Sequence, residues 1–574
     1  MYGRGGINAF FVNDKNIFIG SGQTIIVLDT DGNIRFTLDT DRFIVPNSFI
    51  QLGDRRVAHS NWDNRTLRTT LTVINTETEA WGDTLELPVN TSRTFNGFDD
   101  FLLIYSDGVN LLAIDRVSGE EIQIINWTSS GVESSIVDVL HFLPDDRILL
   151  ITKSPGTGRS DLIILNKTPR DEVPEKIVLT IASTMSHQLS VAVSEFNRTN
   201  SLYSIEIIEV AWDGTATETN KLLLEIITGR GPDMINTYNF PFHHWAGQGL
   251  FIDLYEFIDA DPVLNRSDIL ESVLRNTEIN GKLYQISPDF WVGTIIGHPD
   301  IVGSNRGWTI DEFIAVLNEN PQASRPFGEW YDGRILFYYI IRNDFESFVN
   351  WETGTVNFDN DYFIGLLEFV YELDKSIVLD PPVFGVQMAS QELRLISSGE
   401  QIMKIGSFFR IYEYSAYQDM FGGEFVFKGF PVANGSGNSL DSSSSIAISS
   451  NSKNQQGAWE FVRLLMSEGY QRHSEFNTMP TLKSIFDERL SIAMDGGRSE
   501  VHGDFTVLHR PLTQEDVDDI MTFINSLSSL ASHADPLWDI IEESLSDFYN
   551  GAITAQDAAR IIQNRASTYV AEQG

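Results

Sequence analysis

The segment from Glu225 to Ile252 constrains the fold more than any other part of the chain. Leucine and isoleucine recur at helical spacing up to Ile227, and Gly229 stands where a helix commonly ends in a left-handed residue. Pro232 prevents the helix from continuing, and residues 233–236 then form a short apolar run typical of a buried strand. Aromatic residues follow this run, where an α/β sheet opens its ligand crevice. This order of elements favours a binding protein over an enzyme.

The first 166 residues contain short apolar runs separated by tight turns and almost no helical periodicity. Four similar units can be aligned on the runs at 25–29, 71–75, 111–115 and 162–166. Their spacing of roughly 40 to 50 residues is typical of a four-stranded propeller blade. We therefore predict a β-propeller-like repeat domain over residues 1–166. Because four blades are close to the lower limit for closure, we expect further blades upstream of the given sequence.

The sequence pattern changes after residue 166. Residues 167–176 contain two prolines and several charges, which is typical of a linker. Beyond Ile177, apolar strand-like runs alternate with amphipathic helical segments. We predict strands at 177–182, 205–208 and 233–236, with helices at 186–199 and 218–228. A βαβαβ order of this kind builds a parallel sheet with right-handed crossovers.

Further elements are predicted along the rest of the chain. Thr309 followed by Glu312 is a capping box for a helix over 310–319, and Thr554 with Asp557 caps the last helix in the same way. Trp459 lies on a helical apolar stripe and is expected in the core. Strands are predicted at 282–286, 292–296, 401–405 and 445–449, with a loop over 287–291.

Six segments, taken in chain order, resemble one known family. They read IVLTIAS followed by SEFNRTN, LLLEIITGRGPDMI, GLFIDLYEFI, INGKLYQIS, SSIAISSNSKNQQGAWEFVRLLMS and FYNGAITAQDAARIIQNRASTYVAE. On these segments, residues 177–570 resemble the family 1 extracellular solute-binding proteins that feed ABC importers, especially importers of oligosaccharides. The resemblance implies a fold of the α/β class: a two-lobed, periplasmic-binding-protein-like (type II) clamshell over 177–574. It follows an N-terminal all-β propeller-like domain.

The resemblance also implies a function. The two lobes would close on a ligand that contacts both of them. The partners would be an oligosaccharide or another small neutral solute, and the permease subunits of an ABC transporter. Members are exported, usually as lipoproteins held by an N-terminal cysteine, but this chain contains no cysteine. We expect a monomer that binds its solute outside the cell without a cofactor or a bound metal ion.

Sugars are recognised by aromatic rings and by planar polar groups that bond their hydroxyls. We predict such residues in loops that follow the strands of the second region. Trp212 and Trp291 are the leading candidates, because each lies beside an acid in an expected loop. The full set of predicted ligand-binding residues is Ser183, Thr184, Gln188, Trp212, Asp213, Asn236, Tyr238, Asp289, Phe290, Trp291, Ser407, Phe408 and Arg410.

The composition excludes several classes of function. The formal net charge of −40 opposes binding to nucleic acid and to anionic lipid. The absence of cysteine removes disulfides, thiolate metal sites and a cysteine nucleophile. No apolar run is long enough to cross a bilayer, and the first residues lack the apolar core of a signal peptide. Either the protein is cytosolic or its export signal lies upstream of the given sequence, and we favour the second reading.

Two other functions remain open from the sequence. A glycoside-active enzyme needs two carboxylates on opposite sides of one bond, and a chain with 80 acidic residues could hold such a pair. However, the sequence shows no nucleophile motif, metal cluster or cofactor loop. A surface sensor or adhesion module, in which the propeller-like region contacts a protein, is the third reading.

Overall fold

The computed structural model divides into two compact units. The first contains Met1–Ile177 and Val193–Ser204, and the second contains Val178–Ala192 and Ile205–Gly574. The structure describes residues 7–573 apart from 41–43, 46, 64–67, 89–90, 128, 133, 154–159, 170–174, 211–215, 329–330, 351–352, 377–385, 434–436, 474–477, 497–498, 503–504, 509 and 532–536.

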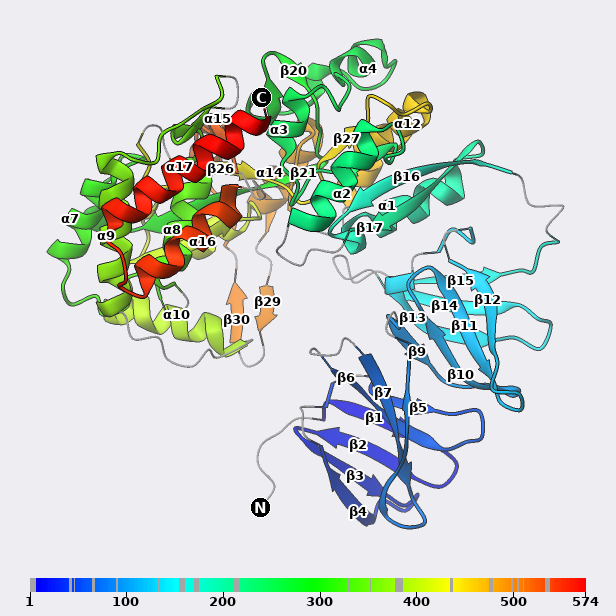
Figure 1. Ribbon diagram of the computed structural model, residues 1–574. Coiled ribbons are helices and arrows are strands. Elements are labelled where there is room, and N and C mark those ends of the chain that lie inside the picture. Colours follow the sequence, from blue (N-terminus) through cyan, green and yellow to red (C-terminus); the bar gives the residue numbers. More distant parts are fainter. Residues whose placement is uncertain are drawn as a thin grey trace. The chain divides into compact units, whose positions relative to one another are not determined.

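The first unit is built of small antiparallel sheets whose strands follow one another in chain order (Figure 1). The strands of the first two sheets are β1 (Ala9–Val12), β2 (Ile17–Ser21), β3 (Thr24–Leu28), β4 (Ile34–Asp39), β5 (Phe49–Gln51), β6 (Val57–Asp63), β7 (Arg68–Asn75) and β8 (Ala80–Glu86). Those of the next two are β9 (Arg93–Phe95), β10 (Phe101–Ser106), β11 (Asn110–Asp115), β12 (Glu121–Asn126), β13 (Val137–Phe142), β14 (Ile148–Lys153) and β15 (Ser160–Leu165), with the short helix η1 (Ser134–Ile136) between β12 and β13.

The four predicted units correspond to these four sheets. The apolar runs used to align them form β3, β7, β11 and β15, which each occupy the third position of their sheet. The prediction of a row of similar antiparallel units is confirmed, whereas closure into a propeller ring stays a prediction. Asp29 accepts hydrogen bonds from the backbone N–H groups of Asp31 (3.0 Å) and Asn33 (2.8 Å), so this segment forms the tight turn between β3 and β4.

The second and third sheets approach each other very closely. The Gly97 N–H donates a hydrogen bond of 2.7 Å to the Gln51 carbonyl, and the Gly53 N–H donates one of 2.8 Å to the Leu102 carbonyl. A Cβ atom added at Gly53 would lie 2.2 Å from the Phe101 carbonyl oxygen. Glycine is therefore required where these backbones meet.

The predicted βαβαβ order begins at Ile177, and most of its residues lie in the second unit, with Ile177 and residues 193–204 in the first. The elements of this order are β16 (Ile177–Ser183), α1 (Ser186–Thr199), β17 (Tyr203–Glu209), α2 (Ala216–Ile227) and β18 (Met234–Asn236). The sheet order is β17-β16-β18-β27, in which β16 and β18 are parallel and β27 (Ile446–Ile448) is antiparallel to β18. The core of this lobe includes Leu222, Ile235 and Trp245, and we call it the first lobe.

A second sheet with a separate core forms the other lobe. Its order is β24-β21-β26-β31, with β25 and β28 also paired to β21. The strands are β21 (Asp289–Gly297), β24 (Met403–Phe408), β25 (Val426–Phe427), β26 (Ser439–Asp441), β28 (Met479–Pro480) and β31 (Ser529–Leu530). Helices α8, α9, α16 and α17 pack together in this second lobe (Figure 1). None of its core residues belongs to the core of the first lobe.

The remaining elements of the unit surround these two sheets. The helices are α3 (Phe242–Gly247), α4 (Tyr255–Ala260), η3 (Arg266–Asp268), α5 (Glu271–Thr277), α6 (Pro299–Val302), α7 (Ile310–Glu319), α8 (Gly333–Asn343), η4 (Phe345–Ser347), α9 (Asp361–Ser376), α10 (Val386–Ser398), α11 (Glu413–Met420), α12 (Gln455–Leu465), α13 (Glu468–His473), α14 (Lys483–Asp495), α15 (Gln514–Asn525), α16 (Leu537–Tyr549) and α17 (Ala555–Gln573). The short strands are β19 (Glu278–Ile279), β20 (Lys282–Leu283), β22 (Val349–Asn350), β23 (Thr355–Val356), β29 (Ser499–His502) and β30 (Phe505–Leu508).

Several boundaries differ from the predictions. The expected loop over 287–291 is shorter, because residues 289–291 already pair with β28 and β26 as the start of β21. Likewise β24 extends to Phe408, since it pairs with β21 along its whole length. The aromatic loop after β18 contains the short helix α3. The differences at β21 and β24 arise from strand pairing that local sequence does not encode.

The predicted helix caps are confirmed. The Thr309 side chain accepts a hydrogen bond from the Glu312 N–H, and the Glu312 carboxylate accepts one from the Thr309 N–H. At the start of α17, the Thr554 side chain accepts a hydrogen bond from the Asp557 N–H, and its hydroxyl group lies 2.8 Å from the Asp557 carboxylate. Trp459 is 2 % exposed, as expected of a core residue, and its indole N–H donates to Asp261.

Candidate functional site

The chain crosses between the two lobes at two adjacent segments. The first runs from Ile286, which pairs with Ile446 beside the first sheet, to Asp289 at the start of β21. The second runs from Asp441 at the end of β26 to Ile446 at the start of β27. Two strand connections of this kind form a hinge, because a few backbone torsions in them change the angle between the lobes.

A buried carboxylate joins the two crossing segments. Asp289 accepts hydrogen bonds from the hydroxyl groups of Ser287 (3.5 Å), Ser442 (3.2 Å), Ser444 and Thr478 (2.8 Å). Its side chain is almost completely inaccessible, and burial raises its pKa although the four hydroxyl groups act in the opposite direction. Asp289 was predicted to bind ligand, but the structure places its oxygens among groups of the chain itself.

A second buried acid lies beside the hinge. Asp441 forms an ion pair with Arg342 of α8, and the two side chains are 4 % and 12 % exposed. In the sheet, Asp441 is the register partner of Trp291. The crossing strand, the second sheet and α8 therefore meet at one place.

Tyr238 approaches this place from the first lobe. It follows β18, and its pKa is raised to about 12 by burial and then by the negative charge of Asp441. The positive charge of Arg342 acts in the opposite direction, and the phenol groups of Tyr338 and Tyr339 also contribute. Charges act on a pKa only at short range, so Tyr238 lies close to the second-lobe residues.

Aromatic rings surround the ion pair. Trp291 contacts Phe409 with ring centroids 5.5 Å apart, and Phe409 is 39 % exposed. Tyr339 stacks on Phe430 at 5.5 Å, and Tyr338 contacts Trp538 at 5.0 Å. We call Tyr238, Trp291, Tyr338, Tyr339, Arg342, Phe409 and Asp441 the hinge cluster.

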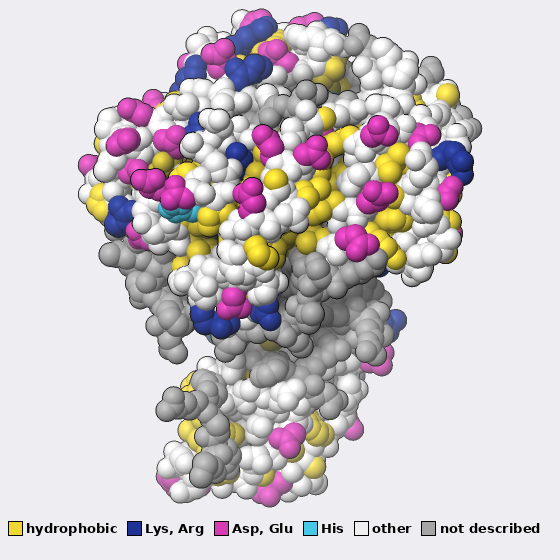
Figure 2. Space-filling view, turned by 90° about the vertical axis from the view of Figure 1, so that its left-hand side faces the viewer, with side chains coloured by type: hydrophobic (Ala, Val, Ile, Leu, Met, Phe, Trp, Pro, Cys, Tyr) yellow, Lys and Arg dark blue, Asp and Glu magenta, His cyan; other side chains and the backbone are white. Residues whose placement is uncertain are grey.

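The loop after β24 is held by one carboxylate. Glu413 accepts hydrogen bonds from the backbone N–H groups of Phe409 (3.1 Å) and Arg410 (3.2 Å). The Tyr417 hydroxyl bonds Glu413 (3.4 Å) and the Ser407 carbonyl (3.3 Å). The position of the Phe409 ring therefore depends on α11. Figure 2 shows acidic side chains scattered over the visible face of the protein, whereas Glu413 is mostly buried at this loop.

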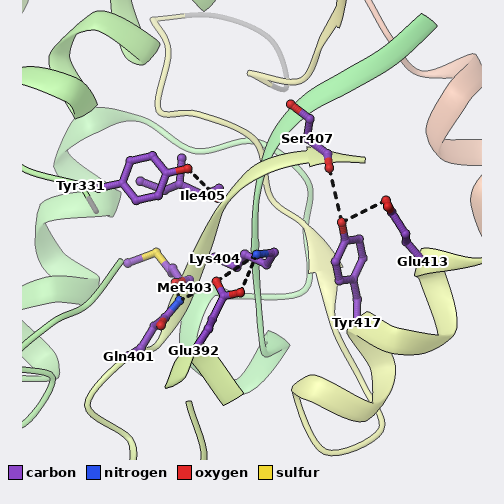
Figure 3. A network of polar contacts seen from close by, with 9 residues as sticks. All are labelled: Tyr331, Glu392, Gln401, Met403, Lys404, Ile405, Ser407, Glu413 and Tyr417. Atoms are coloured by element: carbon purple, nitrogen blue, oxygen red, sulfur yellow. Dashed lines mark hydrogen bonds and ion pairs between the residues drawn. The ribbon is translucent and has the colours of Figure 1, made fainter. Parts of the chain in front are cut away.

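Side chains also cover the outer edge of β24. The carbonyl groups of Met403, Ile405 and Ser407 accept hydrogen bonds from the side chains of Gln401 (2.9 Å), Tyr331 (3.1 Å) and Tyr417 (3.3 Å), respectively. Figure 3 shows this arrangement together with the ion pair between Lys404 and Glu392 (2.8 Å). Covering alternate carbonyl groups prevents the edge strand from pairing with another chain and fixes its path into the loop.

An open pocket lies next to the hinge. Thr478, which bonds Asp289, is part of its wall, and Arg410 directly follows Phe409 of the hinge cluster. The lining residues are Arg410, Ile411, Tyr412, Thr478, Met479, Pro480, Arg489, Ile492, Ala493, Gly496 and Arg510.

Some of the predicted residues are brought together around Tyr238. The Thr184 hydroxyl donates to the Tyr238 carbonyl (3.2 Å), and the Asn236 side chain accepts from the Tyr238 N–H (3.1 Å). Asn236 also donates to the Ser443 carbonyl (2.9 Å), which links the first sheet to the second crossing segment. Thr184 and Asn236 therefore position Tyr238.

Two predicted residues lie near the end of the first strand. The Ser183 hydroxyl is buried and accepts from the Met185 N–H (3.0 Å). The Gln188 side-chain oxygen is buried and has no hydrogen-bond partner among the described residues. Such an oxygen is costly to leave unpaired, which makes Gln188 a candidate acceptor for a ligand hydroxyl.

Other predictions do not lead to the site. Phe290 and Phe408 are completely buried, the first against Phe486 and the second in an aromatic core with Phe427. They lie in strands rather than loops and point into the core, so we leave them out of the site. Ser407 interacts through its backbone carbonyl. Trp212 and Asp213 lie outside the described residues.

Sequence reasoning missed Tyr338, Tyr339, Arg342 and Asp441. Two adjacent tyrosines, with an arginine about one helical turn later, could have marked α8. Nothing local marks Asp441, because its role depends on pairing with Arg342, which is 99 residues away in the sequence.

Comparisons with known proteins place these observations in a family. The model of the family "Bacterial extracellular solute-binding protein" matches residues 183–472, which is just over half of the chain. No curated protein matches the chain in a sequence search. Within the described residues, none of the helices combines the length and hydropathy that a bilayer-spanning segment needs.

Solved structures match this chain at low sequence identity. An ABC substrate-binding protein from Listeria monocytogenes in complex with cycloalternan is 15 % identical, with a TM-score of 0.43, over 69 % of this chain and 100 % of that one. The maltose/maltodextrin-binding domain of Bdellovibrio bacteriovorus, bound to maltotriose, is 12 % identical with a TM-score of 0.42, over 69 % and 100 % of the two chains. The GacH receptor of Streptomyces glaucescens is 14 % identical with a TM-score of 0.42, over 69 % and 98 %.

The family match begins at the last residue of β16 and includes β18, both crossing segments and the loop after β24. It confirms the resemblance seen in the sequence, and a family that binds solutes agrees with the prediction that the chain is not an enzyme. The chain belongs to the bacterial extracellular solute-binding protein family.

Proposed function

We propose that the protein captures a neutral carbohydrate, of oligosaccharide size, outside the cell and delivers it to the permease of an ABC transporter. The observation that carries this proposal is the partly exposed ring pair formed by Trp291 of β21 and Phe409 in the loop after β24. Aromatic faces suit the C–H faces of sugar rings, and Tyr238 from the first lobe belongs to the same cluster.

The polar groups of the hinge cluster complement these rings. The Arg342–Asp441 ion pair presents planar donors and acceptors on fixed side chains, and Tyr238 adds a hydroxyl that stays protonated because its pKa is raised. Sugar hydroxyl groups both donate and accept, so a paired Arg and Asp can bond them without binding a net charge. This arrangement favours a neutral polyhydroxylated ligand over an ion.

The same contacts weigh against a glycoside-active enzyme. A hydrolase needs two carboxylates that face one bond across a ligand. The two buried acids of the hinge are otherwise engaged, since Asp289 is bonded by hydroxyl groups and Asp441 by Arg342. Binding without chemistry is therefore the function that the described groups support best.

Titration calorimetry of the full chain against a panel of neutral oligosaccharides tests this proposal. Wild-type protein should bind at least one of them, and Trp291→Ala should weaken that binding by about tenfold or more, as expected when a central aromatic contact is lost. Trp81→Ala is a matched control, because Trp81 is 36 % exposed and lies in the first unit.

The outcomes are distinct. Equal affinity of Trp291→Ala and wild type would place the ligand elsewhere. Release of shortened sugars during the titration would support an enzyme instead, and it can be detected by chromatography of the mixture after the experiment.

A further inference from the structure

The pocket beside the hinge contains an unusual concentration of positive charge. The chain has 40 lysine and arginine residues against 80 acidic ones, yet three arginines, Arg410, Arg489 and Arg510, line this one pocket. Long-range repulsion by the acidic surface disfavours anions in general. A local group of guanidinium side chains would offset that repulsion at this place only.

Contacts within the protein hold the three guanidinium groups. Arg510 lies 3.0 Å from Asp419 and donates to Gln418 at 3.2 Å, and Arg489 donates to the backbone carbonyl of Arg472 at 3.1 Å. Arg410 lies 3.9 Å from Glu413. These contacts fix the orientation of each guanidinium group. The side chains therefore lose less conformational entropy when a ligand binds.

The rest of the pocket wall is mostly apolar. Its apolar residues are Ile411, Met479, Pro480, Ile492 and Ala493. An apolar wall with guanidinium groups suits a ligand that has a carbon body and one acidic group. Because Glu413 and Asp419 already balance part of the positive charge, a single carboxylate fits better than a doubly charged phosphate.

We propose that this pocket binds a carboxylate carried by a small organic body, with Arg410, Arg489 and Arg510 as its guanidinium contacts. The carboxylate has two possible sources, an acidic unit of the captured carbohydrate or a free carboxylic acid. In the first case the inference rests on the proposed function and extends the ligand class to acidic sugars. In the second case the pocket is a separate site.

The pocket also has a structural link to the hinge. Thr478 and Pro480 lie before α14, Gly496 and Arg510 lie after it, and Arg410 follows β24 of the second lobe. Thr478 bonds the hinge acid Asp289. A ligand in the pocket therefore contacts segments that adjoin the crossing strands.

Matched pairs of probes test the proposal on the full chain. Calorimetry compares glucuronate with glucose and benzoate with benzyl alcohol, since each pair differs mainly in the carboxylate. Wild-type protein should bind at least one acid about tenfold or more tightly than its neutral partner, which is a usual effect of a charge-assisted hydrogen bond. Equal affinity within both pairs would overturn the proposal.

Variants then assign the preference to the pocket. Arg489→Gln and Arg510→Gln should each reduce the acid preference by about tenfold, and Arg489→Lys should retain part of it because the charge remains. Arg560→Gln, a change at an exposed arginine of α17, should leave it unchanged. Each variant is first shown to unfold at the wild-type temperature. An undiminished acid preference in both glutamine variants would also overturn the proposal.

Two further comparisons are needed. The first distinguishes an acidic sugar from a free carboxylic acid, and the second distinguishes the carboxylate pocket from the proposed sugar site. Competition between glucuronate and a neutral oligosaccharide supports an acidic sugar, whereas simultaneous binding of benzoate and that oligosaccharide supports a free acid. Trp291→Ala should weaken neutral-sugar binding by about tenfold or more, whereas Arg489→Gln should leave it intact. Failure of one proposal is therefore visible without failure of the other.

Discussion

Asp289 shows how a residue at the site can act on the fold rather than on a ligand. Four hydroxyl groups from both crossing segments and from Thr478 bond its carboxylate, and no ligand is needed to satisfy it. Burial nevertheless raises its pKa, because the charged form loses more hydration than these hydroxyl groups restore. The protonation state of Asp289 therefore affects the hydrogen bonds that join the two crossing segments.

The sign of the pH dependence follows from this raised pKa. A folded-state pKa above the ordinary value of 3.8 means that the folded protein holds the proton more tightly than the unfolded chain. The resulting stability is fully present below about pH 3.8 and is lost as the pH rises through the folded-state pKa. We expect the free energy of unfolding of wild type, relative to Asp289→Asn, to decrease over that window.

Urea unfolding at a series of pH values measures this difference. Asp83→Asn serves as the control, because the Asp83 side chain is 97 % exposed. A free energy of unfolding of wild type that increases relative to that of Asp289→Asn as the pH rises would contradict the assignment of a raised pKa.

At the scale of elements, β24 is the strand of the second sheet that positions the loop carrying Phe409. Its outer carbonyl groups are covered by Gln401, Tyr331 and Tyr417, and its end leads into the loop that carries Phe409. The sequence predicted the helices and strands of the first lobe well, because their periodicity and caps are local. It misplaced the ends of β21 and β24, because those ends depend on pairing with distant strands.

The same reasoning explains which site residues could be predicted. Tyr238 and Trp291 follow or begin strands at a sheet end, a position that local pattern reveals. Arg342 and Asp441 come from α8 and β26, and only their packing brings them together. The contribution of β26 to the site was therefore beyond sequence reasoning.

Removing the hydroxyl groups that cover β24 should destabilise the second unit. Tyr331→Phe and Tyr417→Phe each leave a buried carbonyl with one fewer partner, and each should lower the free energy of unfolding by about 0.5–1.5 kcal/mol. Tyr203→Phe is the matched control, since the Tyr203 hydroxyl has no hydrogen bond with the described residues. Urea unfolding followed by tryptophan fluorescence measures all three, and equal stability of the four proteins would contradict the role of these hydroxyl groups.

At the scale of the whole molecule, the net charge of −40 distinguishes the two proposed ligand types. A neutral sugar carries no charge for the acidic surface to act on, so its affinity should change less than about twofold between low and high salt. Binding of a carboxylate at the arginine pocket should depend strongly on salt, since it relies on ionic contacts. Calorimetry at two salt concentrations measures both, and a salt-sensitive affinity for a neutral sugar would contradict the proposed site.

The most direct test of the account is the distance between the two lobes with and without sugar. Because the chain has no cysteine, Val263→Cys and Asn318→Cys provide two unique, exposed labelling positions, one near each lobe. Spin labels at these positions report the distance by pulsed electron resonance. The account predicts that a neutral oligosaccharide bound in the calorimeter shifts the distance distribution, and that Trp291→Ala abolishes the shift. A bound sugar that leaves the distribution unchanged would contradict capture between hinged lobes.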